Sequence, residues 1–318
     1  MKKPLIILTG PTAVGKTDLS IKLAKAVNGE IISADSMQVY KHMNIGTAKI
    51  MPSEMGGIKH YLIDEFDPQD DFNVVKFKEY AEKYMAEIYA KNKVPIIAGG
   101  TGFYIQAVLY GINFEENDED TSSGVSYRKE LEILAQEKGS LYLHSMLQIT
   151  DPESALSIHP NNVKRVIRAL EYYKQTGNKI SEHNEEQRQK ESPYHFCYFV
   201  LNNKRDVLYE RINKRVDIMM EQGLLEEVKH LLDIGCTKDM VSMQGLGYKE
   251  IIEYLEGKCT LEEAVYILKR DTRHFAKRQL TWFKREKDVI WVNKDQYNDQ
   301  EDKVLEAMIK EIKLKNLI

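Results

Sequence analysis

The fold is decided near the N-terminus by Leu5-Ile6-Ile7-Leu8-Thr9-Gly10-Pro11-Thr12-Ala13-Val14-Gly15-Lys16-Thr17. Residues 5–9 are mostly apolar and end at a glycine, which predicts a buried parallel strand. Residues 10–17 then match G-x-x-x-x-G-K-[ST] in full, and residues 17–27 place apolar side chains on one helical face. A strand, a phosphate-binding loop (the P-loop) and a helix in this order predict a site for a polyphosphate.

Each part of this loop has a chemical reason. The two glycines let the chain curl so that backbone N–H groups point inward at phosphate oxygens, and the following helix directs its positive dipole end at the same place. Lys16 adds a full charge, and the Thr17 hydroxyl can help hold Mg2+, the cofactor that we expect. The predicted diphosphate contacts are Gly10, Pro11, Thr12, Ala13, Val14, Gly15, Lys16 and Thr17, with Thr17 also serving the metal.

Strands and helices continue to alternate after the P-loop. The pattern predicts strands at 30–33, 61–63 and 94–98, and a helix over 74–91. Such alternation is typical of an α/β fold, here a doubly wound parallel sheet with helices on both faces.

The pattern then becomes mostly helical. An acidic run at 115–120 predicts a solvated hinge, and residues 127–184 predict helices before a strand returns at 195–201. We therefore expect a P-loop core of residues 1–114 and 196–318, interrupted by a helical insertion domain of residues 115–195. The C-terminal part of the core is predicted to be helical over 205–287, with a strand at 289–292 that buries Trp291 and a closing helix at 299–315.

Composition excludes several classes of protein. The three cysteines of the 318 residues form no C-x-x-C pair, which argues against a disulfide framework or a zinc module and favours a reducing compartment. No secretory signal and no run of about 20 apolar residues is evident. We expect a cytoplasmic monomer with no membrane contact. The net charge of -4 does not exclude nucleic acid, because binding requires only a local basic face.

Asp35 directly follows the second predicted strand. The carboxyl ends of parallel strands share one edge of a sheet, so Asp35 should lie beside the P-loop. There it could accept a proton from a nucleophile or support the metal, although an Asx turn or a helix N-cap is an alternative role. The strand at 94–98 ends in Gly99-Gly100-Thr101-Gly102, with no aspartate typical of a motor NTPase. The site therefore favours attack on a diphosphate ester by a nucleophile other than water.

A basic helix near the C-terminus predicts an RNA contact. Arg270, Arg273, Lys277 and Lys284 line one helical stripe. Other basic side chains flank it and aromatic side chains interleave, which suits phosphates and splayed bases. An ordinary charged surface helix is the alternative, but such helices usually alternate sign, and only two acidic residues interrupt this one.

Seven motifs together resemble those of the tRNA dimethylallyltransferases (tRNA isopentenyltransferases), in the order of that family. They are residues 10–17, Asp35-Ser36-Met37-Gln38-Val39-Tyr40, Ile45-Gly46-Thr47-Ala48-Lys49, Gly99-Gly100-Thr101-Gly102-Phe103-Tyr104, Arg165-Val166-Ile167-Arg168-Ala169-Leu170-Glu171, Gln244-Gly245-Leu246-Gly247-Tyr248-Lys249 and Ala276-Lys277-Arg278-Gln279-Leu280-Thr281-Trp282-Phe283. The sequence lacks the zinc finger of the eukaryotic relatives, so the resemblance is to the bacterial type.

The resemblance implies transfer of a dimethylallyl group from dimethylallyl diphosphate to N6 of the adenosine just 3′ of the anticodon in tRNA. It implies Asp35 as the general base, Thr101 in the reaction channel and Lys16 among the catalytic groups. It assigns Arg211 and Arg215, which share a helix face, to the diphosphate, with solvated helix charges as the alternative. The implied contacts to the tRNA anticodon stem-loop are Asp35, Ser36, Met37, Gln38, Thr101, Lys164, Arg165, Arg168, Gln244, Gly245, Leu246, Gly247, Tyr248, Lys249, Arg273, Lys277, Arg278, Gln279 and Trp282.

Three other functions share parts of this pattern. A P-loop small-molecule kinase would explain the loop and the sheet but not the basic helix. An adenylate isopentenyltransferase would share the donor site without needing RNA contacts. An RNA-binding protein without catalysis would leave the P-loop unexplained.

Overall fold

The computed structural model describes residues 2–113 and 122–317, so the predicted acidic hinge at 115–120 lies outside the described residues. The chain forms two compact units. One comprises Met1–Leu109 with Pro193–Ile318, and the other is Tyr110–Ser192. The insertion therefore begins and ends a few residues earlier than the boundaries at 114/115 and 195/196 that the sequence suggested.

A single sheet of six parallel strands organises the first unit, in the order β3-β2-β4-β1-β5-β6. The strands are β1 (Lys3–Thr9), β2 (Gly29–Ala34), β3 (His60–Tyr61), β4 (Val94–Gly99), β5 (Tyr194–Asn202) and β6 (Val289–Asn293). This confirms the predicted parallel sheet. The central strand β1 carries the P-loop at its carboxyl end, between the ends of β4 and β5.

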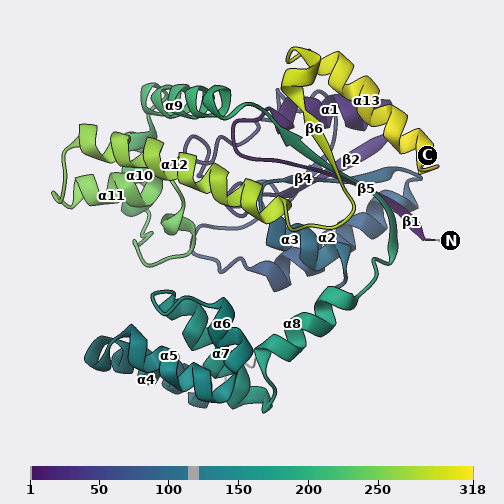
Figure 1. Cartoon of the computed structure of the whole chain (residues 1–318). Coiled ribbons are helices and arrows are strands. Elements are labelled where there is room, and N and C mark those ends of the chain that lie inside the picture. The colour runs from purple at the N-terminus through teal and green to yellow at the C-terminus, as the bar shows by residue number, and fades with distance from the viewer. Residues whose placement is uncertain (1, 114–121, 318) are drawn as a thin grey trace. The chain divides into compact units, whose positions relative to one another are not determined.

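Helices cover both faces of the sheet (Figure 1). Helices α1 (Lys16–Ala26) and α13 (Glu301–Leu314) pack on one face, and α2 (Val74–Ala90) and α3 (Gly102–Leu109) cover the other. A hydrophobic core lies on each face of the sheet, because alternate residues of a strand point to opposite faces. Ile6 of β1 joins the cluster under α1 and α13, whereas the equally buried Ile7 points to the other face. The fold is thus the predicted doubly wound α/β sheet.

Four helices follow β5 in the same unit: α9 (Arg205–Glu221), α10 (Leu224–Asp233), α11 (Tyr248–Leu255) and α12 (Leu261–Phe283). Two 3-10 turns, η1 (Ser242–Gln244) and η2 (Lys294–Tyr297), complete it. The long helix α12 begins at a capping box in which Thr260 and Glu263 satisfy each other's backbone N–H groups. It packs against α9, α11 and α3, and therefore reaches the edge of the sheet that carries the P-loop.

The second unit is wholly helical in its described part. Its helices are α4 (Ser122–Lys138), α5 (Ser140–Thr150), α6 (Pro152–Ser157), α7 (Val163–Thr176) and α8 (Ile180–Gln189). Leucine and valine side chains of α4, α5 and α7 form its own small core. Glu171, buried on α7, accepts two hydrogen bonds from Arg128 at 2.9 and 2.8 Å. The predicted helical insertion is therefore a separate packing unit.

Candidate active site

The P-loop has the backbone shape of a phosphate cradle. Gly10 and Gly15 have φ of 149° and 87°, in the region that favours glycine. A Cβ on Gly10 would also lie 2.5 Å from the carbonyl oxygen of Leu201, so only glycine fits beside β5. The Nζ of Lys16 donates to the carbonyl oxygens of Gly10 (3.0 Å) and Pro11 (2.9 Å), which folds its side chain back across the loop. Thr17 is exposed in the first turn of α1.

Two cations and one carboxylate meet at this loop. The pKa of Lys16 is lowered to about 8 by burial and by the positive charge of Arg215, while the negative charge of Asp35 acts in the opposite direction. Burial also lowers the pKa of Arg215, again opposed by Asp35. The structure thus brings Lys16, Arg215 and Asp35 together from α1, α9 and the end of β2. Arg211, one helical turn earlier, pairs instead with Asp299 at 3.5 Å.

Asp35 also shapes its own loop. Its Oδ1 accepts hydrogen bonds from the backbone N–H groups of Met37 (2.9 Å) and Gln38 (3.3 Å), which is the Asx turn considered from the sequence. The structural role and a catalytic role are compatible, because these bonds use one oxygen of the carboxylate. Thr101 lies beside it, since the Thr101 N–H donates to the carbonyl of Ala34 at 3.1 Å.

The loop after Asp35 is held by polar anchors. The amide of Gln38 donates to the carbonyl oxygens of Thr47 and Ala48, both at 3.2 Å. Lys49 is buried, and its Nζ donates to the carbonyl of Tyr40 at 2.5 Å and to the Asp64 carboxylate. The segment carrying Asp35 is therefore a braced platform and not a free loop.

Glu227 on α10 is an anchor that the sequence did not reveal. Its Oε2 accepts from the N–H groups of Asn44 (2.8 Å) and Ile45 (2.7 Å). Its Oε1 accepts from the Gly46 N–H (3.0 Å) and the Tyr248 hydroxyl (2.7 Å). One carboxylate thus joins the Ile45–Lys49 motif to the Gln244–Lys249 motif. Nothing in the local sequence around Glu227 indicates this, because its partners lie in two distant segments.

The Gln244–Lys249 motif is placed for packing more than for contact with RNA. Tyr248 is fully buried, and a Cβ on Gly46 would lie 2.6 Å from its ring. A Cβ on Gly245 would lie 3.1 Å from the sulfur of Met37. Gly247 is also buried, Leu246 and Lys249 are half-buried, and Gln244 is exposed. The burial of Tyr248 gives its side chain a packing role in this structure.

Helix α12 divides the predicted basic stripe into two parts. Lys277, Arg278 and Lys284 are exposed. Arg273 instead turns inward, donating to the side-chain oxygen of Asn213 at 2.6 Å. Arg270 is exposed as well, so three of the four residues of the predicted stripe face solvent and only Arg273 turns inward.

Two α12 residues expected at the RNA surface point into the protein. Gln279 is only 6% exposed and bonds to the P-loop and to the glycine turn after β4. Trp282 is half-buried against α3, where a Cβ on Gly102 would lie 2.3 Å from its ring. The reason is that α12 packs along α3, which the helical period alone does not reveal. Trp291, expected in the core, is only half-buried because β6 is an edge strand.

A buried lysine behind the P-loop was also missed. Lys294 of η2 is 3% exposed, and its Nζ donates to the Val14 carbonyl at 3.3 Å and lies 3.7 Å from Glu301. It adds a second ammonium group to the surroundings of the loop.

The predicted RNA contacts of the insertion lie on α7. Lys164 and Arg165 are exposed, and Arg168 is half-buried. All three precede the buried Glu171 on the same helix.

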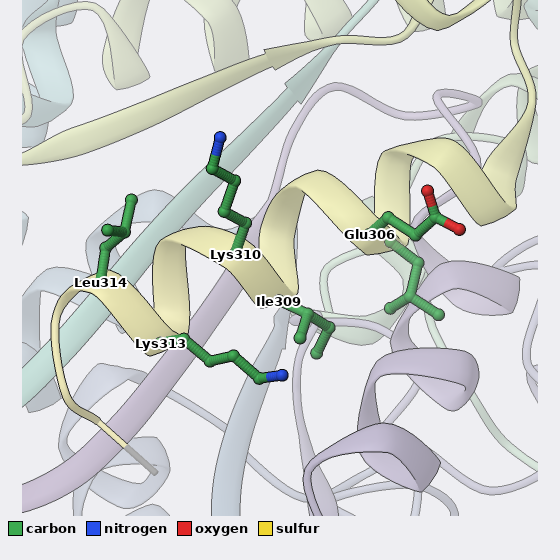
Figure 2. Close-up of a pocket in the computed structure, with 6 residues that line it drawn as sticks. Glu306, Ile309, Lys310, Lys313 and Leu314 are labelled. Carbon is green, nitrogen blue, oxygen red and sulfur yellow. The ribbon is translucent and has the colours of Figure 1, made fainter.

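Two surface hollows lie away from these residues. One, of about 540 Å3, lies on α13 and is lined by Leu305, Glu306, Ile309, Lys310, Lys313 and Leu314. Figure 2 shows these side chains on α13. The other, about 950 Å3, lies at the opposite ends of β1 and β5, near Lys3 and Tyr194. Neither contains a residue of the P-loop or Asp35. Within residues 2–113 and 122–317, no helix is long and apolar enough to cross a membrane.

The parallel sheet with its P-loop, and the carboxylate beside that loop, place the protein in the class of phosphate-binding α/β enzymes. The family model of the IPP transferases matches residues 38–286, and the chain belongs to that family. It is 64% identical to a tRNA dimethylallyltransferase of Lachnoclostridium phytofermentans over 316 residues, covering 99% of both chains. It is 52% identical to the tRNA dimethylallyltransferase of Acetivibrio thermocellus over 304 residues, covering 96% of both.

Solved structures agree with this assignment. The tRNA isopentenylpyrophosphate transferase of Bacillus halodurans is 44% identical, with a TM-score of 0.73 over 99% of this chain and 98% of that one. A eukaryotic dimethylallyltransferase, described as acting on tRNA, is 30% identical, with a TM-score of 0.77 over 92% of this chain and 74% of that one. The chain is therefore a transferase of the prenyl-transfer type.

Proposed function

We propose that this chain transfers a dimethylallyl group from dimethylallyl diphosphate to N6 of the adenosine 3′-adjacent to the anticodon in tRNA, releasing diphosphate. The observation that carries the proposal is that the P-loop and Asp35 follow β1 and β2 at one edge of the sheet, with Lys16 and Arg215 in electrostatic range of the Asp35 carboxylate. A cationic phosphate cradle beside a carboxylate suits a reaction that loses diphosphate at one atom and a proton at another. The names of the relatives give the transferred group, dimethylallyl, and the acceptor class, tRNA.

The donor half follows from the cradle. The inward N–H groups of the P-loop and the charge of Lys16 would bind the diphosphate, and Arg215 would add a second cation. When the allylic C–O bond breaks, the electron pair stays on the diphosphate oxygen. The cations then stabilise more charge in the transition state than in the ground state, and this difference accelerates the reaction.

Mg2+ fits this site as a companion of the diphosphate. Among the described residues, no group of three or more His, Cys, Asp or Glu side chains could hold a metal ion. Mg2+ characteristically keeps several waters and takes phosphate oxygens as ligands, so it needs few ligands from the protein. The hydroxyl at the end of a P-loop is one such ligand. We assign that role to Thr17. When bound, the ion would neutralise charge on the leaving diphosphate.

The acceptor half rests on Asp35. N6 of the adenosine attacks the allylic carbon, the new N–C bond replaces the broken C–O bond, and the proton lost from N6 passes to the Asp35 carboxylate. The Asx turn fixes that carboxylate through one oxygen, which leaves the other for the proton. Thr101 and the segment Ser36–Gln38 would contact the base. The adenosine has to leave its stack to reach them.

The RNA contact is proposed for the exposed basic residues. They are Lys277, Arg278, Lys284 and Arg285 near the end of α12 and Lys164 and Arg165 on α7. Cationic side chains hold the RNA phosphates, so affinity should fall as salt rises. We further propose that the enzyme works as a monomer and in the cytoplasm.

Labelled dimethylallyl diphosphate, offered with bulk tRNA or with AMP, tests the proposal. Label in tRNA at a single adenosine supports it. Label in AMP would replace it with adenylate prenylation. Transfer of phosphate from labelled ATP to a small acceptor, with no prenyl transfer, would indicate a kinase.

A further inference from the structure

Gln279 connects the two halves of the proposed active site. Its side chain is 6% exposed, although it directly follows the exposed Arg278 on α12. The Oε1 atom accepts from the N–H of Thr12 in the P-loop at 2.9 Å, and the Nε2 atom donates to the carbonyl of Gly100 at 3.0 Å. Gly100 directly precedes Thr101. One amide thus spans the loop for the donor and the turn beside the acceptor.

The local packing leaves Gln279 no alternative position. A Cβ on Gly100 would lie 2.2 Å from the Gln279 Nε2, so only glycine admits the amide there. One helical turn later, Trp282 packs on Gly102, and its ring lies 6.2 Å from Phe103. The two contacts fix α12 against the start of α3. The amide is therefore held by a hydrogen bond at each end, on a helix that Trp282 fixes against α3.

We propose that Gln279 is a positioning residue that fixes the distance between the phosphate cradle and the Gly100–Thr101 turn. The inference rests on the proposed function, because it assumes that donor and acceptor bind at these two elements. Its consequence is specific. Losing the brace should harm the alignment of the reactants more than the binding of either, since a displacement of about 1 Å can cost on the order of 100-fold in rate.

The amide is needed because its two partners are unlike. Thr12 offers a donor and Gly100 offers an acceptor, so the side chain has to accept at one atom and donate at the other. Methionine has similar size and can do neither well. An ionised glutamate only accepts and would repel the Gly100 carbonyl, whereas a protonated glutamate can both accept and donate. Burial raises the pKa of a glutamate side chain, so the protonated form would persist toward neutral pH.

The test compares Gln279→Met and Gln279→Glu in the full-length enzyme. We expect kcat to fall at least tenfold in Gln279→Met, with KM for tRNA and for dimethylallyl diphosphate changing less than threefold. The activity of Gln279→Glu, divided by that of the wild type, should rise by at least threefold as pH falls from 8.5 to 6. Gln279→Met should show a flat ratio. Gln222, exposed at the end of α9, provides control substitutions to Met and Glu.

The outcomes separate a positioning role from an RNA contact and from simple packing. A rise in tRNA KM without loss of kcat would make Gln279 an RNA contact and overturn the inference. Equal losses in both variants at every pH would overturn it as well, because packing alone would then account for them. Melting temperatures and labelling by the wild type are measured in parallel. If the wild type fails to label tRNA, the proposed function fails. If the wild type labels tRNA and both variants match it, only the inference fails.

Discussion

Replacing Glu227 with glutamine should loosen the platform that carries Asp35. In the native structure the two carboxylate oxygens share four donors, two on each oxygen, at 2.7–3.0 Å. In Glu227→Gln, one oxygen becomes an NH2 group. Turned toward Gly46 and Tyr248, this group faces one backbone donor and a hydroxyl that can rotate to accept from it. One charge-assisted hydrogen bond is then lost, and the other three become neutral hydrogen bonds.

The size of the effect follows from these bonds. A hydrogen bond to a charged group contributes about 1.5–3 kcal/mol and a neutral one about 0.5–1.5 kcal/mol. Losing one bond and making three neutral would therefore cost about 4–7 kcal/mol without compensation. Glu227 is half-buried, and water can replace part of the loss. We therefore expect the free energy of unfolding to fall by about 3 kcal/mol. We also expect kcat to fall, because the segment that holds Asp35 gains freedom.

Urea unfolding with an unchanged slope m would measure the first effect, and labelling of tRNA the second. Glu226→Gln is the matched control, because this exposed neighbour only pairs with Lys229 at 3.8 Å and should change stability by less than about 0.5 kcal/mol. Similar behaviour of Glu227→Gln and Glu226→Gln would refute the anchoring role.

Three further predictions concern other charged groups. Burial raises the pKa of Glu286 to about 7, so between about pH 4.5 and 7 the folded state keeps a proton that the unfolded state releases, and stability is lost as pH rises through that window. In urea unfolding, the wild type should therefore lose stability between about pH 5 and pH 8. Glu286→Gln should lose less, by on the order of 2 kcal/mol. Lys294→Met should weaken the binding of dimethylallyl diphosphate by about 1 kcal/mol, as measured by calorimetry. Lys303→Met, on the exposed face of α13, is the control, and equal affinities of the two variants would contradict a role for Lys294 behind the P-loop. Arg215→Met should raise the donor KM on the order of tenfold and Arg211→Met much less, since only Arg215 shares the field of Lys16; the reverse order would show that the assignment is wrong.

The sequence predicted those features that are encoded locally. Apolar runs and a complete phosphate-loop motif define β1, the P-loop and α1, and the strand after the insertion was found in the same way. Asp35 was predicted beside the loop from topology alone, since parallel strands end at a common edge. These predictions needed no knowledge of side-chain contacts.

The features that were missed depend on contacts between distant segments. Glu227 joins residues about 180 positions away, and Gln279 bonds to Thr12 across 267 positions. Helical spacing marks a face of α12 but cannot say whether RNA or α3 covers it. The family resemblance assigned Gln279 and Trp282 to RNA, while the structure buries one and half-buries the other.

The central claim is that the Asp35 carboxylate takes the proton of the attacking nitrogen. Asp35→Asn tests it most directly, because asparagine keeps an oxygen to accept from the Met37 and Gln38 N–H groups but loses the base. In single-turnover transfer to tRNA with both reactants saturating, we predict a rate lower by on the order of 100-fold or more, with donor and RNA affinities nearly unchanged. A variant that transfers the dimethylallyl group at close to the normal rate would contradict the claim.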